Sequence, residues 1–220
     1  MDRNDLTIGP DPGALLVIAK EPVAGRAKTR LRPRLTLAQA AQVAEACLLD
    51  TLAEAATTRA RRQVLVFDGD ADRWCPPGWE TVPQRGGALG DRLCNAFTDV
   101  AGPAVVIAMD TPQVSAASLQ RALEAVTEPG TAVIGFTEDG GYWLLGLPAD
   151  RDPVAVFEGV PMSTSRTGAA QHQRLVEIGY QVVELEILRD IDDYADLVAV
   201  APLCTGRRLG TLMSGLAHDW

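Results

Sequence analysis

The amino-acid sequence predicts an α/β protein built on a mainly parallel β-sheet. Short apolar runs that suit strands buried on both faces alternate with longer amphipathic stretches that suit helices. Such alternation favours a parallel sheet with right-handed crossovers, in which ligands bind beyond the carboxyl ends of the strands. A length of 220 residues is sufficient for one such core, so we expect a single main domain.

Three strands and two helices are expected in the N-terminal half of the chain. The first apolar run reads A-L-L-V-I-A and follows Pro and Gly, which suits a buried strand. Thr36 precedes a long stretch rich in Ala and Leu, and its hydroxyl can cap the N-terminus of that helix. In chain order we expect a strand at 14–19, a helix at 37–56, strands at 63–67 and 80–82, and a helix at 88–100.

The C-terminal half is expected to continue the alternation. Two apolar runs flank the turn Asp139-Gly140-Gly141, which suits a hairpin or a bent pair of strands. Gly179 is placed to end a helix that begins at Ser163 or Thr164. The expected elements are a strand at 103–109, a helix from 115 to 126, strands at 131–136 and 143–147, a helix at 163–178, an edge strand at 181–185 and a short helix at 193–200. The domain is expected to span 14–202, between a flexible tail at 1–13 and a C-terminal extension at 203–220.

Composition and charge exclude several classes of function. A net charge of -9 and a pI near 4.7 argue against a protein that binds a nucleic acid polymer, because such proteins need a broad basic surface. The four cysteines form no C-x-x-C pair, which indicates free thiols in a reducing compartment. We expect no membrane span, and the acidic N-terminus differs from a signal peptide, so a cytoplasmic protein is expected.

A basic loop follows the first expected strand and reads K-E-P-V-A-G-R-A-K-T-R-L. Gly25 permits close approach of the backbone, and the cations around it are suited to neutralise a di- or triphosphate. The residue order of a Walker A loop is absent. A solvated basic loop explains the same composition, but its place directly after a buried strand favours a binding role. The loop residues expected at the phosphates are Lys20, Gly25, Arg26, Lys28, Thr29 and Arg30.

Carboxylates occur at the ends of later strands. Asp110 follows the strand at 103–109, where a carboxylate can hold a divalent cation that bridges phosphates, although Asp-x-Pro is also ordinary turn chemistry. In the run T-E-D-G-G-Y-W, Glu138 and Asp139 can bind a metal or sugar hydroxyls, and Tyr142 or Trp143 can stack on a ring. A hairpin turn whose aromatic residues enter the core is the alternative for this run.

Two further runs carry polar side chains before helices. R-D-I-D-D at 189–193 gathers carboxylates, which are also favoured at a solvated helix N-terminus. M-S-T-S-R-T at 162–167 offers hydroxyls and Arg166 to an anion or an acceptor, and ordinary helix capping explains it equally well.

Taken together and in this order, these motifs resemble the family called DUF2064, or the radical-SAM/selenodomain-associated transferase 1 family. Its members look like glycosyltransferase-A (nucleotide-diphospho-sugar transferase) proteins, which implies a three-layer α/β/α Rossmann-like fold. They are also similar to molybdenum-cofactor and phospholactate guanylyltransferases. The resemblance covers residues 15–200, and its most specific segments are 20–31, Q-R-G-G-A-L-G-D-R-L at 84–93 and T-E-D-G-G-Y-W-L-L-G-L at 137–147. Further support comes from F-E-G-V-P at 157–161 and D-I-D-D-Y-A-D-L at 190–197.

The motifs and the resemblance together assign an expected role to each group of residues. The phosphate loop is as given above, and the residues expected near the base and ribose are Gln84, Gly87, Gly90 and Arg92. The expected metal ligands are Asp110, Asp139 and Asp192. The expected acceptor or sugar contacts are Glu138, Gly140, Gly141, Tyr142, Ser163 and Thr164. The expected catalytic residues are Lys28, Asp110 and Asp139, with Asp139 as first choice for a base and Glu138 as second.

The activity implied is metal-dependent transfer from a nucleotide-activated donor to a small-molecule acceptor, with Mg²⁺ or Mn²⁺. A glycosyltransferase would use a nucleotide-sugar, whereas a nucleotidyltransferase would use a nucleoside triphosphate and release pyrophosphate. The six cations at 20–34 favour a triphosphate, but the family is described as glycosyltransferase-like, and glycosyl transfer is our first expectation. Two departures from the family, Ala108-Met109 for Gly-Ser and Met162 for a tryptophan, leave the acceptor open and motivate a third hypothesis, a non-catalytic nucleotide-binding protein.

Overall fold

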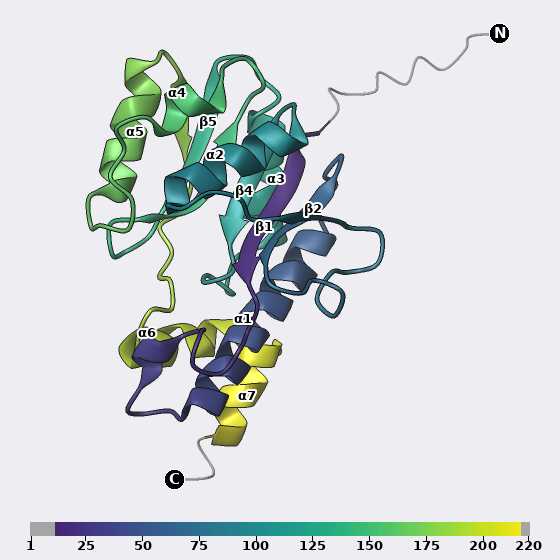
Figure 1. Cartoon of the computed structure of the whole chain (residues 1–220), viewed down its shortest axis with the longest axis vertical. Helices are drawn as coiled ribbons and strands as arrows, with labels where there is room; N and C mark the ends of the chain where they lie inside the picture. Colours follow the sequence, from purple (N-terminus) through teal and green to yellow (C-terminus); the bar gives the residue numbers. More distant parts are fainter. Residues whose placement is uncertain (1–11, 217–220) are drawn as a thin grey trace, which may run out of the picture.

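A seven-stranded β-sheet organises the computed structural model, which describes residues 12–216 (Figure 1). Its strand order is β3-β2-β1-β4-β6-β5-β7. β6 runs antiparallel to β4 and β5, and the other neighbours pair in parallel, so the mainly parallel sheet is confirmed. The strands are β1 (Ala14–Lys20), β2 (Gln63–Asp68), β3 (Glu80–Pro83), β4 (Ala104–Ala108), β5 (Thr131–Phe136), β6 (Tyr142–Leu147) and β7 (Gln181–Glu184).

Helices cover both faces of this sheet, which confirms the three-layer architecture. Because successive side chains of a strand point to opposite faces, Leu15 and Val17 join one core cluster with α1 and α3, while Leu16 and Ile18 join another with α2, α4 and α5. The α-helices are α1 (Leu37–Ala56), α2 (Leu89–Val100), α3 (Ala116–Ala125), α4 (Pro153–Phe157), α5 (Thr167–Glu177), α6 (Tyr194–Val200) and α7 (Arg208–Leu216). Two 3-10 turns, η1 (Thr29–Leu31) and η2 (Ala201–Cys204), complete the described elements.

Two helical details differ from the sequence-based expectation. α5 begins at Thr167 rather than at Ser163 or Thr164. Ser163 has a positive φ of 58°, and the Thr164 amide donates to Thr167 Oγ1 at 3.0 Å, so these residues form a turn that precedes the helix. The expected set also lacked α4, which starts at a proline and is capped by Asp152.

The C-terminal segment forms a helix, α7, that was not predicted from the sequence. α7 packs on α1, and a third cluster joins them through Val43, Cys47 and Leu209. Figure 1 shows α6 and α7 beside the part of α1 that extends away from the sheet. Residues 1–11 of the expected tail and 217–220 of the expected extension lie outside the described residues. Within residues 12–216, none of the helices has the length and hydropathy needed to cross a membrane.

Asp50 of α1 binds the N-terminus of α7. Asp50 is only 3% exposed, and its carboxylate accepts hydrogen bonds from the Arg208 and Leu209 amides, each at 2.9 Å. Buried amides at a helix start need acceptors, so we expect Asp50→Ala to lower the free energy of unfolding by about 2 kcal/mol. Urea denaturation measures this change, with Asp152→Ala as the control because Asp152 caps α4 from an exposed position. A loss no larger than that of the control would contradict the anchoring role.

Candidate functional site

A cavity of about 790 Å³ opens at the carboxyl ends of the parallel strands. Lys20 ends β1 and Ala108 ends β4, while Tyr142 begins the antiparallel β6 and therefore lies at the same edge. The basic loop, the segment after β4, the turn between β5 and β6, and the approach to α5 all contribute to its walls. The predicted site residues that line it are Lys20, Arg26, Lys28, Thr29, Arg30, Asp110, Asp139, Gly141, Tyr142, Ser163, Thr164 and Asp192.

Other predicted site residues lie outside this lining, namely Gly25, Gln84, Gly87, Gly90, Arg92, Glu138 and Gly140. The Gln84 amide group is used within the protein: its nitrogen donates to the Ala19 and Val66 carbonyls at 2.7 and 3.3 Å, and its oxygen accepts from Arg92 at 3.2 Å. The side chain expected to contact the base therefore ties β1, β2 and α2 together. Glu138 instead faces Arg189, with 3.7 Å between their charged groups.

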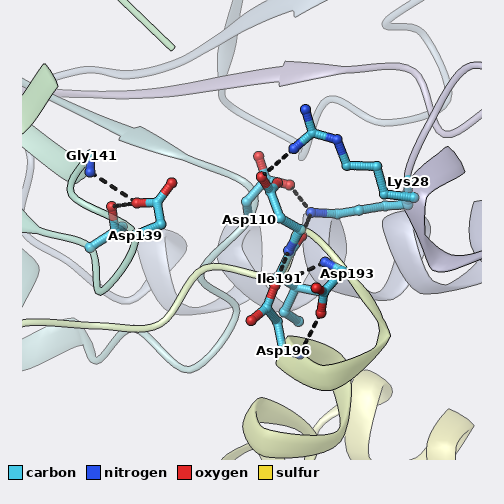
Figure 2. Close-up of polar contacts among 10 residues, drawn as sticks. Lys28, Asp110, Asp139, Gly141, Ile191, Asp193 and Asp196 are labelled. Atoms are coloured by element: carbon cyan, nitrogen blue, oxygen red, sulfur yellow. Dashed lines mark hydrogen bonds and ion pairs between the residues drawn. The ribbon is translucent and has the colours of Figure 1, made fainter. Parts of the chain in front are cut away.

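Lys28 and Asp110 meet directly in the cavity wall (Figure 2). The Lys28 ammonium donates to the Asp110 carboxylate and to the main-chain carbonyl of Ile191. Its side chain is only 7% exposed, and the residue has a left-handed backbone with φ of 49°. Burial is the largest single influence and opposes the charged form, but Asp110, Cys47 and Asp192 together outweigh it and raise the pKa of Lys28 above its ordinary value. The basic loop after β1 and the Asp110 carboxylate after β4 therefore meet in one cavity.

Three carboxylates, Asp139, Asp190 and Asp192, gather beside this pair, and one oxygen atom from each lies within 4.8 Å of the other two. Burial, together with the charge of Asp139 and the other nearby carboxylates, raises the pKa of Asp190 to about 6. The Ile191 amide donates to the Asp110 carbonyl at 3.0 Å, which places Asp110 next to the group. Carboxylate oxygens suit Mg²⁺ or Mn²⁺, so this donor set fits such an ion.

Asp190 is the one member of this trio absent from the predicted ligands. Its signal in the sequence is the D-I-D spacing, because residues two apart in an extended segment point to the same side. Asp192 also pairs with Arg30 at 2.9 Å, so a second cation of the basic loop reaches the acidic group. That pair is largely exposed, at 76% for Arg30 and 50% for Asp192.

The turn between β5 and β6 sets the direction of Asp139. Oδ1 of this residue accepts from the Thr137 hydroxyl at 2.5 Å and from the Gly141 amide at 2.9 Å. The Gly140 carbonyl accepts from the Gly168 amide at 2.9 Å, which docks the turn on the start of α5. One carboxylate oxygen is thereby fixed within the turn, and the other remains for a ligand.

Hydroxyl groups also line the cavity. Ser163, Thr164 and Ser165 contribute to it together with Thr137 and Tyr142. Burial raises the pKa of Tyr142 well above its usual range, so its hydroxyl stays protonated. Met162 packs on Gly90 of α2, and its sulfur lies 3.9 Å from the Tyr142 hydroxyl.

Comparison with known proteins agrees with this fold. The chain resembles a protein from Desulfovibrio desulfuricans G20 described as a candidate nucleotide-diphospho-sugar transferase, with a TM-score of 0.83, 25% identity, and coverage of 92% of this chain and 94% of that chain. A cytidylyltransferase from Leptospira borgpetersenii serovar Hardjo-bovis gives a TM-score of 0.58, 11% identity and 94% coverage of both chains. A Mycobacterium tuberculosis H37Rv protein solved in complex with manganese gives 0.52 and 22% identity, covering 87% of this chain and 98% of that one.

Sequence comparison assigns the chain to a family. No curated protein matches it by sequence. A family model matches residues 34–164, which is more than half of the chain. The chain therefore belongs to the family described as "Uncharacterized protein conserved in bacteria (DUF2064)", and it has the glycosyltransferase-A-like fold that its motifs predict.

Proposed function

We propose that this protein is a metal-dependent transferase that takes a nucleotide-activated donor, and that the group it transfers is a sugar. The observation that carries the proposal is the meeting of Lys28 with Asp110 in one cavity, between a basic loop and the trio Asp139, Asp190 and Asp192. Cations on one wall and carboxylates on the next are suited to hold a pyrophosphate and a divalent ion side by side.

In this proposal, different residues of the cavity bind the phosphates and the metal ion. Lys20, Arg26 and Lys28 bind the phosphates and stabilise the negative charge that grows on them as the bond to the transferred group breaks. Asp110 and the trio hold Mg²⁺ or Mn²⁺, which when bound supplies Lewis-acid stabilisation of the leaving phosphate. Asp139 is fixed through one oxygen, and the turn directs its other oxygen toward the metal site.

Glycosyl transfer is the first form of this proposal. The acceptor oxygen would bond to the anomeric carbon of the sugar while the bond from that carbon to the phosphate oxygen breaks, and the nucleoside diphosphate takes the electron pair. Ser163, Thr164 and Tyr142 supply hydroxyls suited to hydrogen-bond a sugar. The likeness to the D. desulfuricans protein, at a TM-score of 0.83, supports the same form.

Nucleotidyl transfer is the second form, and the number of cations favours it. Four basic residues of the loop line the cavity, namely Lys20, Arg26, Lys28 and Arg30, which is more charge than a diphosphate needs. In this reaction an acceptor oxygen would bond to the α-phosphorus while the bond from that phosphorus to the bridging oxygen breaks and pyrophosphate leaves. The released product separates the two forms: nucleoside diphosphate for one, pyrophosphate for the other.

A thermal-shift screen of nucleotide-sugars and nucleoside triphosphates, with and without Mn²⁺, tests the proposal. A ligand at about 100 times its Kd adds about 2.7 kcal/mol to stability, which in a chain of this size raises Tm by roughly 5–10 °C. We expect donor and Mn²⁺ together to give such a rise beyond that of Mn²⁺ alone, followed by turnover of that donor with an acceptor. If the donor raises Tm equally with and without Mn²⁺, and no donor is turned over, the result would instead support a non-catalytic nucleotide-binding protein.

A further inference from the structure

Lysine is confined to the cavity in this protein. The sequence has 20 Lys and Arg residues in total, and only two of them, Lys20 and Lys28, are lysine. Both line the cavity. An ammonium is a compact point charge with three donors, whereas the guanidinium used at every other basic position is a planar fork. The cavity thus contains the two basic side chains that most closely resemble a bound metal cation.

The surroundings of Lys28 are those of an oxygen-ligated cation. Its ammonium contacts the Asp110 carboxylate and the Ile191 carbonyl, and its side chain is only 7% exposed. Both partners are hard oxygen donors of the kind that Mg²⁺ and Mn²⁺ take. The left-handed backbone of Lys28 is costly for a residue with a Cβ, which indicates that the surrounding fold imposes this placement.

The neighbouring pair of Arg30 and Asp192 provides a contrast. These groups lie 2.9 Å apart but are 76% and 50% exposed, so water and salt screen their attraction. Within residues 12–216, Lys28 is the basic side chain that combines burial with direct contact to a carboxylate of the proposed metal site.

We propose that Lys28 is an exchangeable internal cation. In the free protein its ammonium occupies the place between Asp110 and the Ile191 carbonyl, and it moves to the donor phosphates when the donor enters with its metal ion. This inference rests on the proposed function. When no phosphate is present, the Lys28 ammonium and the metal ion compete for Asp110. Once the donor phosphates bind Lys28, the metal ion can bind Asp110 without this competition.

The scarcity of lysine allows a direct test by chemical labelling. The full chain is acetylated with a water-soluble N-hydroxysuccinimide ester beside an added lysine-containing reference peptide, and peptide mass spectrometry compares the rate at Lys28 with the rate at that peptide. We expect Mn²⁺ alone to speed acetylation of Lys28 relative to the reference peptide by about fivefold or more. Inorganic tripolyphosphate added with Mn²⁺ should slow it again, because the released ammonium then binds phosphate.

Calorimetric titration of Mn²⁺ into Lys28→Met gives a second, independent measurement. Methionine keeps the length of the side chain without the charge, so Mn²⁺ affinity should rise by about fivefold or more, while affinity for the donor from the thermal-shift screen should fall. Arg26→Met is the matched control, because Arg26 lines the same cavity but makes no ion pair within residues 12–216. It should weaken donor binding and change Mn²⁺ affinity by less than about twofold.

The outcomes separate this inference from the proposed function. The exchange is wrong if Mn²⁺ binds the wild-type protein but leaves the rate of Lys28 acetylation unchanged, or if Lys28→Met does not raise the affinity for Mn²⁺. Lys28 would then form a fixed structural ion pair with Asp110, and the transferase proposal would still stand. If the wild-type protein binds neither Mn²⁺ nor any donor, both are wrong. Circular dichroism of Lys28→Met establishes that the variant is folded before its affinities are compared.

Discussion

Replacing Asp110 with asparagine is expected to lower turnover of the donor by on the order of a hundredfold to a thousandfold. Asp110 lies directly after β4, contacts the Lys28 ammonium, and accepts the Ile191 amide through its carbonyl at 3.0 Å. The amide of asparagine keeps a hydrogen-bond acceptor for Lys28 but removes the negative charge that a divalent ion requires. Mn²⁺ affinity should therefore fall together with turnover, while the fold is retained.

Asp193→Asn is the matched control for this variant. Asp193 belongs to the same acidic run as Asp192, but it caps α6 by accepting from the Ala195 and Asp196 amides at 2.8 and 3.1 Å. Asparagine caps a helix nearly as well as aspartate, so this variant should keep both turnover and Mn²⁺ affinity. If Asp110→Asn kept wild-type turnover, or if both variants lost it equally, Asp110 would not be a specific metal ligand.

The elements around the basic loop follow from local signals in the sequence. The sequence predicts Thr36 as the N-cap of α1, and Thr36 caps this helix through a capping box with Gln39. The strand before the loop was expected to be buried on both faces, and β1 is buried from Ala14 to Ala19. Such features depend on residues close together in the chain, so periodicity and capping chemistry are sufficient to predict them.

The parts of the site that the sequence reading missed depend on contacts between distant residues. Asp190 joins the acidic trio because its segment is held across the end of the sheet, where Leu188 bridges Thr137 and the Ile191 amide reaches Asp110. The Gln84 amide, which the resemblance places near the base, donates to main-chain carbonyls of two strands. Nothing within a few residues of either position encodes these partners.

α7 was missed for a related reason. Its sequence R-L-G-T-L-M-S-G-L contains two glycines, which lower the helix propensity of the segment. Gly210 is required by packing, since a Cβ there would lie 2.4 Å from the Cys204 carbonyl oxygen. The helix is stabilised by its contact with α1 and by the Asp50 cap, and neither is visible in the local sequence.

Replacing Gly140 with alanine is expected to lower the free energy of unfolding by about 3 kcal/mol. Gly140 has φ of +91°, and a Cβ there would lie 2.0 Å from the Ser165 carbonyl oxygen. That oxygen belongs to the backbone before α5, so the clash cannot be relieved by a side-chain rotation. The turn must then separate from the start of α5, which Gly140 otherwise binds through the Gly168 amide at 2.9 Å.

A matched variant separates this clash from the cost of the backbone conformation alone. Gly78 has φ of +83° with no atom within 4 Å of the Cβ position, so Gly78→Ala should cost only about 1 kcal/mol. Urea denaturation of both variants measures the difference. Gly140→Ala should also weaken Mn²⁺ binding in calorimetry, because the displaced turn no longer directs Asp139 into the cavity. Equal losses of stability in the two variants, with Mn²⁺ affinity unchanged, would mean that docking of this turn on α5 does not shape the site.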